Sequence, residues 1–167
     1  SILKEKHRQI QTALEHRKAI NTNARTYTAA TNEVSVLLAM ANAGQSDALL
    51  SADKITTAIA GVLEQQAVAL SLVCAESRPE SGQELAMQAI NVSTLALLTA
   101  KTLKLSSEES RYVGMGGLLH NIGMNRVPLA VRLKHEDDMS PTEAKLLRMY
   151  PQLGKEILEA IPGIAPD

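Results

Sequence analysis

The segment from Gly116 to Met124, GGLLHNIGM, guides the interpretation of the whole chain. An apolar helix rich in small residues runs into a single histidine, His120, and then breaks at Gly123. We expect this arrangement to direct the imidazole of His120 into the interior, where a polar ring needs a hydrogen-bond partner. The segment is therefore the first place to look for a functional site.

Helical signals lie on both sides of this segment. Ser106 and Glu109 predict a capping box at the start of the helix that leads to His120, and residues 140–143 (SPTE) predict a second capped helix start. No region alternates with period two, so the chain is predicted to be all-α. Residues 83–103 are expected to form a helix with this apolar stripe: Leu85, Ala89, Val92, Leu95, Ala96 and Thr99.

Three glycines, Gly114, Gly116 and Gly117, fall inside the predicted helix that ends at His120. Each costs up to about 1 kcal/mol relative to alanine in a helix interior. We expect the close approach of another helix to this face to offset that cost.

The amino-terminal region is predicted to contain two separate helices. Residues 3–25 have sparse apolar positions at helical spacing, and a short helix from Val34 should end near Gly44. The first helix is either a solvated linker or a dimerising signalling helix. Its apolar seam consists of Leu3, Ile10, Leu14 and Ile20.

A further helix is expected to start at a capping Ser51 and to run to Ala75. Residues 78–82 (RPESG) are then expected to form a polar loop within the domain.

Composition excludes several classes of function. The net charge of −1 over 167 residues argues against nucleic-acid binding, and the absence of Phe and Trp argues against stacking on bases. No segment resembles a signal peptide or a membrane span. The single cysteine, Cys74, can form neither an internal disulfide nor a thiolate metal site. We therefore expect a cytoplasmic protein without a membrane partner.

Residues 118–123, LLHNIG, resemble the LLHDIGK signature of the HD superfamily of metal-dependent phosphohydrolases. The resemblance covers roughly residues 85–164. It implies an HD-domain-like helical bundle over residues 31–167, preceded by an N-terminal helical linker or dimerisation helix over residues 1–30. Further motifs resemble the bacterial HD-GYP branch, whose active members hydrolyse cyclic di-GMP: Val127-Pro128, Ser140–Glu143, Tyr150-Pro151 and Gly154. The family's Gly-Tyr-Pro element would lie beyond Asp167.

The resemblance also implies where a metal site would lie. It places the first ligand histidine at Gln88, the His-Asp pair at His120 and Asn121, the following lysine at Met124, and a further ligand histidine at Tyr150. Of the ligand positions, only His120 keeps a metal-binding residue type. Neutral amides, a thioether and a phenol are poor donors for a hydrolytic two-metal centre. We therefore expect no catalytic residue, no metal and no cofactor.

His120 has two interpretations. It is either a core histidine, hydrogen-bonded to Asn121, Gln88 or a backbone carbonyl, or a metal ligand. Gln88 and Asn121 could also pair amide to amide, which would replace a metal cluster by a neutral hydrogen-bond network.

Other candidate residues are weaker. His7 and His16 are expected to be solvated, and residues 135–138 (HEDD) to form a solvated acidic turn. Ser71 and Cys74 have no histidine near them in sequence. None of these residues predicts a nucleophile–base pair.

Three functions remain. The first is a catalytically inactive HD-GYP-like module that binds a protein partner, such as a diguanylate cyclase domain, a response regulator or a second copy of itself. The second is a cyclic di-GMP phosphodiesterase with an altered or incomplete site, which would need Fe or Mn. The third is a sensor that binds the nucleotide without cleaving it, for which three arginines are available: Arg111, Arg126 and Arg148.

Overall fold

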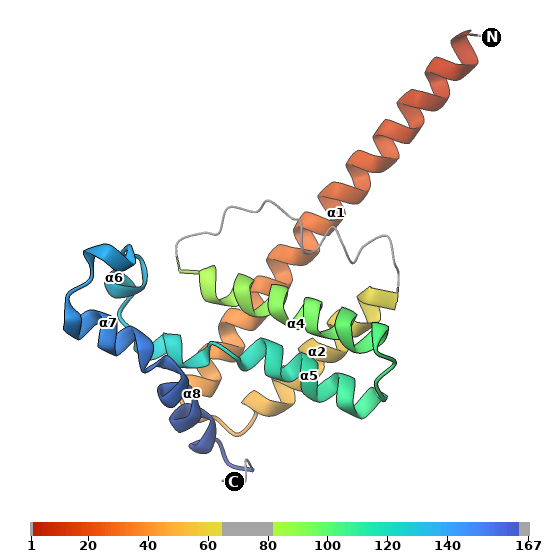
Figure 1. The fold of residues 1–167 in the computed structure, drawn as a ribbon. Helices are drawn as coiled ribbons and strands as arrows, with labels where there is room; N and C mark the ends of the chain where they lie inside the picture. The colour runs from red at the N-terminus through yellow and green to blue at the C-terminus, as the bar shows by residue number, and fades with distance from the viewer. Residues whose placement is uncertain (1, 65–81, 164–167) are drawn as a thin grey trace.

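The structure is a computed structural model that describes residues 2–64 and 82–163. Every regular element in these ranges is a helix, which confirms the all-α prediction (Figure 1). The α-helices are α1 (Ile2–Asn42), α2 (Ala48–Glu64), α4 (Glu84–Thr102), α5 (Ser107–Leu119), α6 (Leu129–Arg132), α7 (Pro141–Arg148) and α8 (Tyr150–Glu159). Two short 3₁₀ helices are η1 (Ile122–Arg126) and η2 (Glu136–Asp138).

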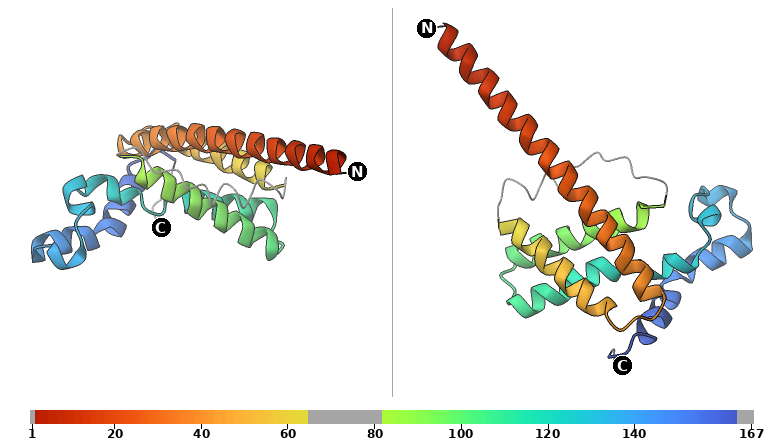
Figure 2. Two further views of the ribbon diagram at one scale, coloured as in Figure 1. Left: turned by 90° about the horizontal axis from the view of Figure 1, so that it is seen from above. Right: turned by 180° about the vertical axis from the view of Figure 1, so that it is seen from behind.

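Two layers of helices form the body of the protein. Helices α1 and α2 pack together in one layer and cover α4 and α5 in the other (Figure 2). The core between the layers is aliphatic because the chain has no Phe or Trp. Its largest members on these helices include Val34, Leu37, Leu38, Ile55, Ile59, Leu63, Ile90, Leu97 and Leu118.

Helix α1 is one continuous helix, so the prediction of two separate amino-terminal helices is wrong. No glycine or proline interrupts residues 2–42, and the amino-terminal half extends beyond the body (Figures 1 and 2). The predicted end near Gly44 is confirmed. Gly44 has a φ of +67°, its N–H donates to Ala41 O, and the N–H of Gln45 donates to Met40 O. The division of the chain at residue 30 stays a prediction.

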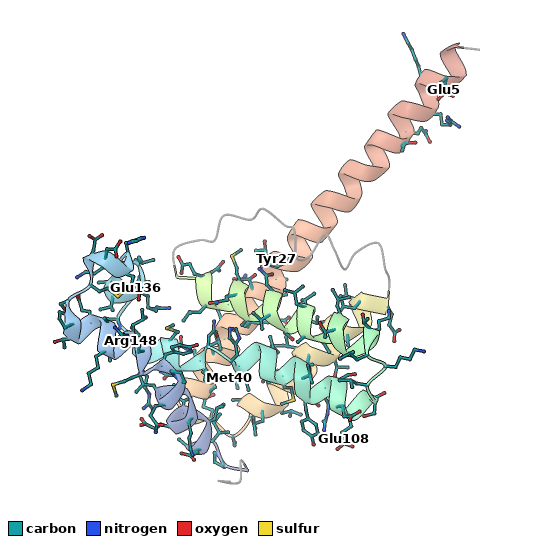
Figure 3. All side chains as sticks on the ribbon, viewed as in Figure 1. Glu5, Tyr27, Met40, Glu108, Glu136 and Arg148 are labelled. Carbon is teal, nitrogen blue, oxygen red and sulfur yellow. The ribbon has the colours of Figure 1, made fainter. Side chains whose placement is uncertain are left out.

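Tyr27 lies where α1 enters the body (Figure 3). The side chain is only 2% exposed, and its hydroxyl donates to Asn91 Oδ1 of α4 at 3.0 Å. Burial raises the pKa of Tyr27, although the hydrogen bond with Asn91 lowers it. The phenol is therefore neutral and joins the two layers.

Helix α2 begins at Ala48, so the prediction of a capping Ser51 is wrong. Ser51 lies within the first turns, and its N–H donates to Asp47 O. The physical reason is that Ala48, Leu49 and Leu50 favour helix and extend it towards the amino terminus. Beyond Glu64, the predicted continuation to Ala75 and residues 78–81 of the predicted loop lie outside the described residues.

The buried face of α4 differs from the predicted stripe. Leu95 is 50% exposed and Thr99 is also exposed, whereas Ala89 is buried as predicted. The buried residues are Ala86, Ala89, Ile90, Ser93, Thr94, Leu97 and Ala100. This face is inward because its small residues allow α5 to approach closely.

The glycines of α5 explain this close approach. A Cβ atom at Gly117 would lie 2.6 Å from Ser93 Cα, and one at Gly114 would lie 2.5 Å from Thr56 Cγ2. The hydroxyl of Ser93 also donates to the carbonyl of Gly114 at 2.8 Å. The predicted helix contact is confirmed at Gly114 and Gly117, but Gly116 faces open space.

Both predicted capping boxes are present. Ser106 Oγ accepts from the N–H of Glu109, and Ser140 Oγ accepts from the N–H of Glu143, while each glutamate accepts from the N–H of its serine. The caps fix the start of α5, which leads into the site segment (residues 116–124), and the start of α7, which follows that segment in the chain.

Candidate functional site

The site segment is a sharp transition from α5 into η1. Helix α5 ends at Leu119, His120 follows in helical conformation, and Asn121 precedes η1. Gly123 of η1 packs against α8, where a Cβ atom would overlap the carbonyl oxygen of Tyr150 and lie 2.5 Å from the nitrogen of Gly154. Only glycine fits at this crossing, which fixes the position of residues 120–124 against α8.

Asn121 is the buried polar residue of the segment, with 3% of its surface exposed. Its Nδ2 donates to Gln88 Oε1 of α4 at 3.0 Å and makes a long contact of 3.5 Å with Leu85 O. The Leu85 carbonyl can only accept, so the nitrogen of Asn121 faces it, and Gln88 then presents its Oε1 to the same nitrogen. The other amide atom, Oδ1, is buried without a hydrogen-bond partner among the described residues.

His120 does not enter the interior, so the prediction of an inward imidazole is wrong. The residue is exposed, and its Nδ1 lies 2.7 Å from the carbonyl oxygen of Gly117. Because a carbonyl only accepts, Nδ1 carries the proton in this contact and the neutral ring has its lone pair on Nε2. The inward position belongs to Asn121, the next residue, where the chain turns from α5 into η1.

A cavity of about 280 Å³ lies beside the Gln88–Asn121 pair. Gln88 and Met124 line it, whereas His120, Asn121 and Tyr150 do not. Tyr150 is partly buried at the start of α8. The other lining residues are Glu84, Leu85, Leu129, Arg132, Leu133 and Leu147. The structure therefore joins Gln88 to Asn121 by a hydrogen bond and to Met124 through a shared cavity.

A family model for the HD domain matches residues 9–166. The chain belongs to the HD-domain family. This match confirms, at the level of the superfamily, the resemblance of residues 118–123 to the HD signature. The HD domain suggests a superfamily of the phosphohydrolase type. Searches of curated proteins and of solved structures returned no match.

The resemblance assigns the position of the signature aspartate to Asn121, whose amide is buried. The partner amide comes from Gln88, at the position that the resemblance gives to a ligand histidine. Among residues 2–64 and 82–163, no group of three or more His, Cys, Asp or Glu side chains is placed to hold a metal ion. No helix in these same ranges is long and apolar enough to cross a membrane.

The other candidate residues do not converge on the cavity. Residues 135–138 form an exposed turn that contains η2, as predicted; Glu136 and Arg148 lie on the α6–α7 lobe (Figure 3). Arg111 pairs with Asp53 at 3.3 Å and Arg126 with Glu156 at 3.4 Å. The side chains of His7 and His16, and all of Ser71 and Cys74, lie outside what the structure describes.

Arg132 is the residue at this site that sequence reasoning missed. It lies at the end of α6, lines the cavity and has a buried Nε atom without a partner. In the sequence it is one basic residue between Val131 and Leu133, and no motif distinguishes it from the other arginines.

Proposed function

We propose that this HD domain is a non-catalytic module of the HD-GYP type that acts by binding another protein in bacterial cyclic di-GMP signalling. The observation that carries the proposal is the hydrogen bond from Asn121 Nδ2 to Gln88 Oε1. The resemblance assigns a ligand histidine and an aspartate to these two positions, which instead hold neutral amides joined by one hydrogen bond.

The donor chemistry at this site does not fit a hydrolytic two-metal centre. Such a centre needs anionic oxygen and imidazole nitrogen to offset the charge of the cations and to lower the pKa of a bound water. Asn121 and Gln88 are neutral, and the amide nitrogen of Asn121 points at Gln88. Met124 offers a thioether where the family has a lysine.

The partner is proposed to be a diguanylate cyclase domain, a response regulator or a second copy of the chain, in the cytoplasm. Supporting this is α1, whose amino-terminal half extends beyond the body with a seam of apolar positions in its sequence. An isolated helix gains little stability by itself, so packing against a partner is the expected source.

One observation favours the alternative of a metal-dependent phosphodiesterase. The contact between His120 Nδ1 and the Gly117 carbonyl leaves Nε2 free and the ring exposed. Metal-binding histidines are commonly held by such a second bond. The alternative would need further ligands, because a single imidazole does not hold a catalytic metal.

Calorimetric titration with Mn²⁺ tests the proposal. We expect no stoichiometric binding to the wild-type chain and recovered binding in the double variant Gln88→His, Asn121→Asp, which restores an imidazole and a carboxylate. His120→Ala in the wild-type chain is the control. Stoichiometric binding by the wild type that His120→Ala abolishes would overturn the proposal.

A further inference from the structure

The cavity beside the Gln88–Asn121 pair has the composition of a ligand site. Its volume of about 280 Å³ is close to the lower end of the range for ligand pockets, roughly 300–1,000 Å³. Four leucines and Met124 form most of the wall, and they come from α4, η1, α6 and α7. A wall of this kind favours a small ligand with an apolar body.

Arg132 is the unusual member of this wall. Its side chain makes no hydrogen bond or ion pair with any residue that the structure describes, and its Nε is buried. Arginine is charged at every physiological pH and presents a planar set of donors that matches a carboxylate. The residue as a whole is partly buried and lines the cavity, so its unpaired guanidinium favours an anion there.

Gln88 supplies a second donor at the same cavity. Its Oε1 accepts from Asn121, which leaves Nε2 for another acceptor; within residues 2–64 and 82–163 this nitrogen has none. The amide pair therefore also fixes the orientation in which Gln88 presents an N–H group.

The charge of the wall limits the charge of the ligand. Arg132 is the only cation and Glu84 the only anion among the lining residues, and Glu84 already accepts from the N–H of Gly82. A monoanion would be balanced by Arg132, whereas a dianion such as phosphate would carry excess charge and be repelled by Glu84.

We propose that this cavity binds a small aliphatic monocarboxylate, with its carboxylate on Arg132 and Gln88 Nε2 and its chain among the leucines. The inference goes beyond the proposed function and does not depend on it, because it rests on the free guanidinium and on the apolar wall.

Calorimetry on the full chain with hexanoate tests this site, with hexanamide and inorganic phosphate as matched ligands. We expect hexanoate to bind, and the amide and phosphate to bind at least about tenfold more weakly, as expected for loss of a charge-assisted hydrogen bond or of the apolar contacts. If hexanamide binds as tightly as hexanoate, Arg132 does not recognise the carboxylate. If phosphate binds as tightly as hexanoate, the apolar wall does not contribute to binding. No binding of hexanoate would overturn the site.

Variants assign the binding to the cavity. Arg132→Gln should weaken hexanoate at least about tenfold, and Arg132→Lys, which keeps the charge but loses the planar donors, should weaken it less. Arg126→Gln, which removes an exposed arginine paired with Glu156, is the control and should leave affinity unchanged. If Arg132→Gln does not fold, Arg132→Lys and Gln88→Met decide, and unchanged affinity in both would overturn the proposal.

Discussion

Gly117 lies directly against the backbone of Ser93, and a Cβ atom there would come within 2.6 Å of Ser93 Cα and 2.9 Å of Ser93 N. The contact involves main-chain atoms, so rotation of a side chain cannot relieve it. Gly116, the preceding residue, has no atom within 4 Å of the same position. The two neighbouring glycines therefore have different physical roles.

Gly117→Ala should lower the free energy of unfolding by about 1–3 kcal/mol, because the added methyl group forces α4 and α5 apart. Gly116→Ala is the matched control and should raise that free energy by up to about 1 kcal/mol, since alanine favours helix. Urea unfolding followed by circular dichroism measures both. Equal effects of the two substitutions would contradict the close packing of α5 on α4.

Asn121→Asp should destabilise the protein at pH 7 by about 1–3 kcal/mol. The substitution places a carboxylate, which only accepts, against the acceptors Gln88 Oε1 and Leu85 O in a buried site. Thermal unfolding compared with Asn42→Asp, a substitution at an exposed asparagine, measures the effect. A neutral result for Asn121→Asp would indicate that the observed amide pair does not contribute to stability.

The capping box of α7 predicts a dependence of stability on pH. Hydrogen bonds from Lys134 Nζ at 2.6 Å and from Ser140 hold the pKa of Glu143 down from its usual 4.5 to about 2. A carboxylate with a lowered folded-state pKa stabilises fully above its unfolded pKa, and this contribution is lost as the pH falls through the folded value.

The stability difference between the wild type and Glu143→Gln should therefore be constant from pH 7 down to about 5 and should disappear between about pH 4.5 and 2. Melting temperatures of the two proteins across this range measure it. Glu136→Gln, in the exposed turn, is the control. A difference that persists unchanged at pH 2 would contradict the assignment to Glu143.

Self-association through α1 is the prediction for the partner. Ile10→Glu should convert a dimer into a monomer, because it introduces a charge into the apolar seam. Gln11→Glu, at a position that is exposed, adds the same charge and should leave the mass unchanged. Light scattering measures both masses. A wild-type monomer would exclude a second copy as the partner and leave a different protein.

The sequence predicted the elements whose signals are local. Both capping boxes and the end of α1 at Gly44 follow from residues within one turn of each other, and the structure contains all three. The glycines of α5 also predicted a neighbouring helix, although they could not identify Ser93 as the contact.

Positions decided by packing could not be predicted in the same way. Helix α5 packs closely only on a face of α4 that carries small side chains. That face includes Ser93, which is buried, whereas Leu95 is exposed. His120 and Asn121 are adjacent in sequence, and only the turn from α5 into η1 decides which of them is inside. Arg132 could not be recognised because its importance comes from an apolar wall built by four elements.

A non-catalytic function is tested most directly by assaying hydrolysis of cyclic di-GMP by the purified chain with added Mn²⁺ or Fe²⁺, with His120→Ala as the parallel control. We expect no turnover above the rate of that variant, because Gln88 and Asn121 are neutral amides that hydrogen-bond to each other and supply no imidazole or carboxylate to a metal. Turnover that depends on metal and is abolished by His120→Ala would contradict a non-catalytic function.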